Sequence, residues 1–449
     1  MSRQQKLVLY ISILASFVAF LDGSVVNVAL PAISRDLGGG LATQQWMVDA
    51  YLITLGAFIL LAGSLSDLFG RKRILSAGLV GFAAMSTACA LAPSSLILIA
   101  SRGLQGEAGA LLVPSSLALI ISSFSGKEQG KAIGAWTAWM GISFIVGPLL
   151  GGFLVDTLSW RLIFAINVLP IAACLWLLKR LKQPRQTKIV KVDAVGAVLC
   201  SLGLIATVFG LIEQPHYGWH SGLIVVPLAS GFIMLASFLW YEARNAAAML
   251  PLSLFRVRNF RVGNLATVAI YGALSVATFL IVIFLQQVGR YSALDAGLAL
   301  LPVTVIMFFL SPRFGTLAGI YGSRLFMAAG PILAGGGFLL MLRVTSPVHY
   351  WSQLFPGVVT FGIGLATTVA PLTEAVLADI GPQHAGVASA VNNAVSRIAG
   401  LIMIALIGVI VGNTITLNGF RRATLVTAFL IIIGGAVSAI GVRNHAPAK

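Results

Sequence analysis

Charged residues are scarce in this chain of 449 residues, and acidic residues are the scarcest. Only 9% of the residues are charged, 29 of them basic and 13 acidic, whereas 58% are hydrophobic and the mean hydropathy is +0.97. Such a composition excludes an ordinary soluble domain, in which about a quarter of the residues carry a charge. The net charge of +16 does not indicate a nucleic-acid-binding protein, because the cations lie in short segments between apolar runs and form no basic face with stacking aromatics.

Cysteine is also rare, and its spacing indicates neither a metal site nor redox chemistry. Cys89, Cys174 and Cys200 all lie inside apolar runs, where we expect them to pack as small apolar side chains. Two histidines, His216 and His220, lie in a polar turn and are expected to be solvated. The chain has no nucleotide-binding loop and no interfacial cluster of His, Asp or Ser. We therefore expect no metal, no cofactor and no membrane enzyme, and an ion gradient as the energy source.

Most of the chain consists of long apolar runs, and each of them can cross about 30 Å of hydrocarbon as a helix. We place spans at 8–30, 45–66, 74–92, 96–122, 130–155, 160–178, 193–213, 222–241, 262–287, 295–319, 325–342, 351–376, 385–411 and 422–442. The first run follows Lys6 but lacks a small-x-small cleavage site, so we expect it to be retained. An even number of spans places both termini on one side, and the excess of cations there predicts that this side is cytoplasmic.

A short basic segment occurs at matching places in two halves of the chain. Gly63–Arg73 lies between the second and third spans and is expected to form a turn of about ten residues, in which Asp67 accepts hydrogen bonds from backbone N–H groups. On its charge alone, this turn could be only a topology signal. A degraded copy, Gly315–Arg324, begins 252 residues later and has Gly319 in the place of Asp67. The repeat indicates a membrane transporter of two related halves.

We therefore expect an all-α polytopic membrane protein with fourteen transmembrane helices. The expected parts are an N-terminal six-helix half at 1–178, a cytoplasmic basic linker at 179–192, two inserted transmembrane helices at 193–241, a second cytoplasmic basic linker at 242–261, and a C-terminal six-helix half at 262–449. A twelve-helix alternative would force both inserted segments out of the membrane. That alternative fails because each of them is long and almost uncharged.

Ionisable groups within spans are the functional candidates, since each costs about 2.5–3.5 kcal/mol at a helix centre. Asp22 in the first span and Arg102 in the fourth reach comparable depths when about 1.5 Å is counted per residue. Opposite charges at one depth would offset each other's insertion cost, so we expect the two side chains to be partners facing one cavity. The alternative is that each pairs separately with backbone and water.

Further polar residues extend the expected substrate cavity. Glu107 lies about 140° around the helix from Arg102, where a desolvated carboxylate could hold a proton or attract a cation. Asp49 lies about one turn in from the outside and is expected to be a vestibule charge, close to Trp46. Arg397, near the middle of the penultimate span, is expected to face the protein interior. Together with Asp22, these four residues are the expected substrate cavity.

The fifth span carries Gly141, Gly147, Pro148, Gly151 and Gly152. The spacing of Gly147 and Gly151 lets a neighbouring helix approach closely, and Pro148 can bend its own helix. We expect a packing and hinge element that binds nothing by itself.

Taken together, these segments resemble the fourteen-helix drug:proton antiporter subfamily of the major facilitator superfamily over nearly the whole chain. Leu21–Pro31 is similar to the first-helix signature of that subfamily, and Arg102–Gly106 to the fourth-helix motif implicated in proton transfer. Gly141–Gly152 is similar to the fifth-helix motif that separates exporters from importers, and Gly63–Lys72 to the loop signature of the superfamily. Asp49 adds a resemblance to the quaternary-ammonium exporters.

The resemblance implies proton-coupled efflux of lipophilic cations across the bacterial cytoplasmic membrane by alternating access. It implies proton coupling at Asp22 and Arg102, with Glu107 as the alternative proton acceptor. Glu107 departs from the family pattern, which has an aliphatic residue there. The implied partners are the lipid bilayer, protons and a small lipophilic substrate, with no nucleic acid and a monomeric protein. Export of an endogenous metabolite, such as a lipid precursor, siderophore or amino acid, remains open.

The loop signature implies a conformational latch in the first half of the chain. Its members are Gly63, Asp67, Gly70 and Arg71, and the resemblance implies that they hold the inside ends of the halves in one conformation without touching substrate. The resemblance gives neither the substrate nor the role of the inserted helices.

Overall fold

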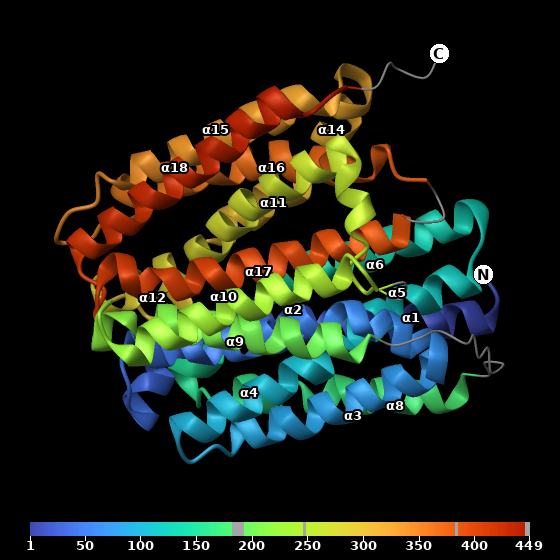
Figure 1. The fold of residues 1–449 in the computed structure, drawn as a ribbon. Helices are drawn as coiled ribbons and strands as arrows, with labels where there is room; N and C mark the ends of the chain where they lie inside the picture. Colours follow the sequence, from blue (N-terminus) through green and yellow to red (C-terminus); the bar gives the residue numbers. More distant parts are fainter. Residues whose placement is uncertain (182–192, 246–247, 382–384, 445–449) are drawn as a thin grey trace. The chain divides into compact units, whose positions relative to one another are not determined.

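The computed structural model describes residues 1–181, 193–245, 248–381 and 385–444, and every regular element in these ranges is a helix (Figure 1). The helices up to the first gap are α1 (Arg3–Leu37), α2 (Leu41–Phe69), α3 (Arg71–Ala90), α4 (Ser95–Ala110), α5 (Leu112–Ser123), α6 (Gly126–Thr157), α7 (Leu162–Ala165) and α8 (Val168–Arg180). The others are α9 (Ala194–Tyr217), α10 (Gly222–Glu242), η1 (Leu252–Arg256), α11 (Arg258–Val276), η2 (Ala277–Ile281), α12 (Val282–Gln287), α13 (Ala293–Leu298), α14 (Leu301–Tyr321), α15 (Ser323–Met341), η3 (Tyr350–Leu354), α16 (Phe355–Ala378), α17 (Ala385–Val411) and α18 (Leu417–Gly441).

The helices are those of a multi-pass membrane protein. Within the described residues, thirteen helical segments are long and apolar enough to cross a membrane, and α2, not among them, is 29 residues long. These thirteen helices, or fourteen when α2 is included, correspond to the fourteen expected spans. Several helices extend beyond the expected ends of the spans, because the polar residues there are also helical. At the start of α1, the Ser2 hydroxyl accepts a hydrogen bond from the Gln5 N–H, and the Gln5 side chain accepts one from the Ser2 N–H.

Some expected spans are interrupted, which the hydropathy pattern does not predict. The fourth span divides at Leu111 into α4 and α5. Pro114 accounts for this break, because it has no N–H to donate to the Ala110 carbonyl. The π-helical turns η2 and η3 occur in the first and fourth spans of the C-terminal half. Such turns widen a helix locally and are frequent at functional sites.

The chain divides into two compact units, of which unit 1 comprises Met1–Thr207 and Ala229–Met249. Within unit 1, α1 packs against α5, α6 and α8, while α4 packs against α2 and α3. These helices, blue to green in Figure 1, run roughly parallel or antiparallel to one another. The interior of this unit therefore lies where α1, α3 and α4 meet.

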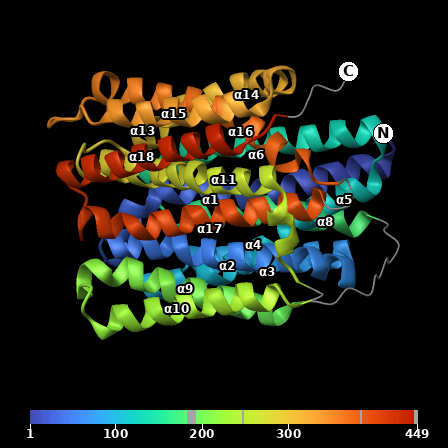
Figure 2. The same ribbon diagram turned by 45° about the horizontal axis from the view of Figure 1, so that its top comes forward.

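Unit 2 comprises Val208–Leu228 and Leu250–Lys449. Within it, α16 packs against α11, α14 and α15, and α18 packs against α11 and α15 (Figure 2). Glycines bring α15 and α16 close together: a Cβ on Gly337 would lie 2.6 Å from the Gly357 carbonyl oxygen, and one on Gly364 would lie 2.6 Å from the Gly330 carbonyl oxygen. Close backbone approach through small residues is the usual way that membrane helices pack.

The inserted pair, α9 and α10, also packs through glycines. A Cβ on Gly203 of α9 would lie 2.9 Å from Leu235 of α10, and one on Gly231 of α10 would lie 3.0 Å from the Gly203 carbonyl oxygen. Asp193 connects the ends of the pair, because its carboxylate accepts hydrogen bonds from the Gly196 N–H and the Asn245 amide. Most of the expected linker at 179–192 lies outside the described residues, as do positions 246–247 of the second linker.

Candidate functional site

Asp22 forms the centre of a buried polar network in unit 1. It lies on α1, and its side chain is 0% exposed. One carboxylate oxygen, Oδ2, accepts a hydrogen bond from Arg102 Nη1 at 2.5 Å. The other, Oδ1, accepts from Gln105 Nε2 at 3.0 Å and from Asn167 Nδ2 at 2.9 Å. The carboxylate is therefore fully engaged by three donors, one of them a cation.

Arg102 is held as firmly as Asp22. Besides its ion pair, Nη1 donates to Gln105 Oε1 at 2.7 Å, and Nε donates to the Met47 carbonyl oxygen of α2 at 3.2 Å. The guanidinium carbon lies 4.2 Å from the centre of the Tyr51 ring, within the range of a cation–π interaction. The side chain is 1% exposed. The predicted pairing of Asp22 with Arg102 is present, but the pair lies in a packed interior and not in an open cavity.

The remaining members of the network are Gln105, Asn167 and Ser86. The Ser86 hydroxyl of α3 accepts hydrogen bonds from Gln105 Nε2 at 2.8 Å and from Asn167 Nδ2 at 3.3 Å. Asn167, between α7 and α8, leaves its Oδ1 without a hydrogen-bond partner in the described structure. Because donors from α4 and from the segment between α7 and α8 meet at one carboxylate of α1, a change in its charge would be felt in all three segments.

A close contact between α2 and α4 sets the position of Arg102. A Cβ on Gly106 of α4 would collide with the Tyr51 carbonyl and the Thr54 hydroxyl of α2. The Thr54 hydroxyl donates to the Gly103 carbonyl oxygen at 2.7 Å. Gly106 therefore lets the helix carrying Arg102 approach the carbonyl of Met47 and the ring of Tyr51.

Sequence reasoning did not identify Gln105, Asn167 and Ser86 as site residues. Gln105 lies three residues after Arg102 and so faces the same side of α4, which is a usable signal. Asn167 is an amide in an apolar span and gives a weaker signal. Ser86 gives none, since hydroxyls in membrane helices usually bond to their own backbone.

Glu107 does not join the network. It is exposed and lies on the same face of α4 as Leu104, which is 55% exposed. Arg102 and Gln105 occupy the buried side of the helix, as the predicted angle between Glu107 and Arg102 requires. Glu107 and Asp22 are therefore separate acids with different surroundings.

Asp49 is buried and is not the vestibule charge that the sequence predicts. Its side chain is 0% exposed, and neither of its carboxylate oxygens has a hydrogen-bond partner among the described residues. α2 begins at Leu41, so Asp49 lies two turns into the helix and not one. Trp46, one turn before it, is half-buried. An unpartnered buried carboxylate is costly, which makes Asp49 a candidate for a group that changes its surroundings during function.

Arg397 lies on α17 in unit 2 and is half-buried. Its charge acts on Tyr271 of α11. Five residues earlier on α17, the Asn392 amide donates to Asn264 Oδ1 at 3.1 Å and to the Thr267 hydroxyl at 2.8 Å. Arg397 thus lies at a polar part of the contact between α11 and α17, in agreement with the expected inward orientation.

The expected ten-residue turn around the latch is wrong. α2 continues to Phe69 and α3 begins at Arg71, so Gly70 alone reverses the chain. Its φ of +93° is accessible to glycine at little cost, and its carbonyl oxygen accepts from the Arg73 and Ile74 N–H groups. Gly322, with φ +87°, is the single residue between α14 and α15. The two copies of the loop therefore reverse in the same way, as the predicted repeat requires.

The structure describes the other latch residues only in part. Gly63 is half-buried within α2 and has open space at its Cβ position. Arg71 is half-buried and takes part in interactions at the start of α3. The side chain of Asp67 lies outside the described residues.

The glycines of α6 differ in what surrounds them. A Cβ on Gly147 would collide with the Ser24 hydroxyl of α1, and one on Gly151 would lie 2.5 Å from Val25 Cγ2. Gly152 is buried, and α6 continues through Pro148 without a break. The predicted close approach at Gly147 and Gly151 is therefore present, with α1 as the neighbour. Gly141 has no atom within 4 Å of its Cβ position, so it is not a packing glycine.

A matched pair of substitutions tests this contact. We expect Gly147→Ala to lower the free energy of unfolding by about 1–3 kcal/mol, because the new methyl group would push α6 away from α1. Gly141→Ala should leave stability unchanged or slightly raise it, since alanine favours a helix and has room there. The thermal midpoint of purified protein in detergent measures both, and equal midpoints would contradict the assigned contact.

Comparisons with known proteins show the family and the fold of the chain. A family model described as Major Facilitator Superfamily matches residues 12–404. The multidrug resistance protein Stp of Mycobacterium tuberculosis is 35% identical over 418 residues, which cover 91% of this chain and 76% of Stp. A probable actinorhodin transporter of Streptomyces coelicolor is 32% identical over 409 residues, covering 88% of this chain and 70% of that protein. The crystal structure of peptide transporter POT in complex with sulfate has the same fold, with a TM-score of 0.73 at 13% identity over 98% of this chain and 94% of that one.

Proposed function

Because the chain belongs to the major facilitator superfamily, we propose that it exports lipophilic, cationic drugs from a bacterial cell in exchange for protons. Its relatives are transporters, so the chain is a transporter and not an enzyme. A relative named for multidrug resistance supports drug efflux. The proposed coupling to protons rests on a single observation, the buried pair of Asp22 and Arg102.

The mechanism that we propose uses this pair as a charge switch. With Asp22 ionised, its three donors hold α1 to α4 and to the segment between α7 and α8. A proton reaching Asp22 removes the counter-charge of Arg102 and weakens the strongest of the three bonds. The helices can then rearrange and expose the site to the other side, where the proton leaves. Alternating access of the two halves around a central substrate site completes the cycle.

The charge pattern of the sequence supports the orientation in the membrane that we propose. Both termini lie in the cytoplasm, the protein spans the bacterial cell membrane fourteen times, and it works as a monomer in the manner of the fourteen-helix drug:proton antiporters. The proton gradient supplies the energy without a cofactor, and each net charge carried inward contributes about 2.3 kcal/mol per 100 mV. Asp67 and Arg71, with Gly63 and Gly70, hold one conformation closed.

Dye flux from liposomes tests the proposal. Purified protein is reconstituted into liposomes loaded with ethidium, and flux is followed with and without an imposed proton gradient. We expect the gradient to accelerate ethidium movement across the bilayer in proportion to protein content. Protein that moves ethidium equally well without a gradient would contradict proton coupling, and protein that moves none would contradict the drug substrate.

A second candidate is export of an endogenous metabolite. The name of the actinorhodin transporter favours it, because a relative that covers most of this chain is named for a single compound. The same liposomes can be loaded with extracts of the source cells. Gradient-dependent loss of one compound, together with no ethidium flux, would establish this candidate in place of drug efflux.

Asp49 gives a further prediction for cation export. We propose that this carboxylate becomes a binding partner for the cationic substrate when the site opens. Asp49→Asn is then expected to keep or raise the thermal midpoint, since it removes an unpartnered buried acid, while ethidium flux falls several-fold. Asp156→Asn, at the end of α6, is the control for loss of one acid and should retain parental flux. A lower midpoint with parental flux would assign Asp49 a purely structural role.

A further inference from the structure

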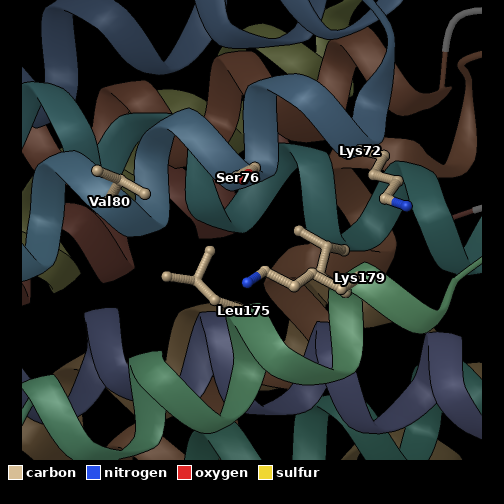
Figure 3. Close-up of a pocket in the computed structure, with 6 residues that line it drawn as sticks. Lys72, Ser76, Val80, Leu175 and Lys179 are labelled. Carbon is tan, nitrogen blue, oxygen red and sulfur yellow. The ribbon is translucent and has the colours of Figure 1, made fainter.

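A groove on unit 1 lies between α3 and α8, away from the Asp22 network. Its volume is about 530 Å³. It is lined by Lys72, Ser76, Val80, Leu175, Leu178 and Lys179 (Figure 3). No acidic residue is among the six. The lining combines two ammonium groups with apolar side chains.

The apolar side chains lie along the groove, and both lysines start at one end of it. Lys72 lies in the first turn of α3, and Val80 lies eight residues later on the same face, about 12 Å further along the axis. Lys179 lies in the last turn of α8, whereas Leu175 lies one turn deeper. Both lysines therefore start from the same end of the groove. Figure 3 shows the Lys179 side chain running back along it toward Leu175, whereas the Lys72 ammonium group points away from that of Lys179.

The charged end of the groove lies at the level of a membrane interface. The Arg180 guanidinium lies 3.6 Å from the centre of the Trp176 ring, which is 53% exposed. Exposed tryptophan and cations together mark the level of lipid headgroups. Lys72 Nζ donates to the Leu181 carbonyl oxygen at 2.7 Å, but in the described part of the chain no ion pair joins Lys72 or Lys179 to a carboxylate. Neither ammonium group thus has an anionic partner there, and that of Lys72 would exchange the Leu181 carbonyl oxygen for an anion from outside the protein.

We propose that this groove binds an anionic phospholipid. In the proposed complex, the ammonium groups of Lys72 and Lys179 turn from their positions in this structure toward a phosphate between them. The Ser76 hydroxyl can donate to the phosphate or to the glycerol oxygens, and an acyl chain covers Val80 and Leu175. The fit is one of charge and polarity: an anionic headgroup matches two ammonium groups that lack a carboxylate partner, and a hydrocarbon chain matches the apolar part. A free phosphate ion would leave that apolar part uncovered. Basic pockets between transmembrane helices are known to take such headgroups.

Lipid binding here would act on the start of α3. Lys72 follows Gly70 and Arg71, so a bound headgroup holds the helix end at which α2 and α3 reverse. The proposal is independent of proton coupling and of the exported substrate, because neither Lys72 nor Lys179 contacts the Asp22 network in the described structure.

Native mass spectrometry of the full chain in detergent, titrated with phosphatidylglycerol or phosphatidylcholine, tests the proposal. We expect the parent to bind phosphatidylglycerol preferentially, and Lys72→Gln/Lys179→Gln to weaken that binding about thirtyfold, equivalent to about 1 kcal/mol for each lysine. Arg73→Gln/Arg180→Gln is the matched control, since it removes two cations at the same end that do not line the groove. Val80→Trp fills the apolar part without changing charge and should also weaken binding.

The outcomes separate the alternatives. Loss of preference in the groove variants with retention in the control supports the site. Equal losses in the groove and control pairs would show general attraction to basic surface, and unchanged binding in every variant would place the lipid elsewhere. Glycerol phosphate is added as a competitor at millimolar concentration. Displacement of the lipid by this competitor would show that the site takes a free anion, which would overturn the proposal.

Discussion

Asp22→Asn is expected to reduce gradient-driven ethidium flux to the level of protein-free liposomes. Asparagine has the shape of aspartate and can still accept hydrogen bonds from Gln105 and Asn167, but it cannot take up and release a proton. The change removes the counter-charge of Arg102 as well. Flux must therefore be expressed per folded protein, measured as the monodisperse fraction recovered from the liposomes.

Two controls make this result specific. Asp22→Asn/Arg102→Gln removes both charges and should remain folded yet inactive, which would separate loss of coupling from loss of structure. Glu107→Gln removes an acid that is exposed and outside the network, and should retain most of the flux. Flux that survives in Asp22→Asn and disappears in Glu107→Gln would reverse the assignment and make Glu107 the coupling acid.

Arg102→Gln is expected to have the largest effect on stability, about 3–5 kcal/mol. It leaves the Asp22 carboxylate buried without a positive partner, and an uncompensated buried charge costs far more than a lost surface pair. It also removes the donor to the Met47 carbonyl oxygen and the cation above Tyr51. The measurement is the thermal midpoint in detergent, together with the amount of protein recovered from membranes.

A double-mutant cycle isolates the charge contribution. Asp22→Asn/Arg102→Gln should recover a large part of the loss in Arg102→Gln, because no charge then remains in the network. Additive losses in the double variant would mean that the two residues stabilise the fold separately. That result would contradict the network, although not the membership of the superfamily.

The ion pair could be predicted from sequence because the depth of a residue in a span, and with it the insertion cost, follows from its position along the helix. Counting residues from the ends of two spans was enough to bring Asp22 and Arg102 to one level. The partners of the pair depend on how each helix is rotated and on which helices are neighbours. Neither quantity follows from hydropathy, so Asn167 and Ser86 could not be predicted.

Helix ends and local packing could not be predicted from sequence either. The turn at Gly70 was expected to be ten residues long because charged residues were assigned to loops, yet Asp67, Arg71 and Lys72 continue the helices on both sides. Gly141 and Gly147 look alike in sequence. Only the neighbouring α1 distinguishes them, since it touches one and not the other. Asp49 was placed near the surface because the start of α2 was set four residues too late.

The absence of solvent exposure at Asp22 has a consequence for energy loss by the cell. Under the proposed mechanism, a coupling acid in permanent contact with water on both sides would let protons run down their gradient without carrying substrate. In the structure described here, the carboxylate is enclosed by Arg102, Gln105 and Asn167, so it can exchange its proton only when those partners move. The rate of that movement then limits both useful turnover and futile proton leak. Proteins with a looser packing around Asp22 should transport faster but waste more of the gradient.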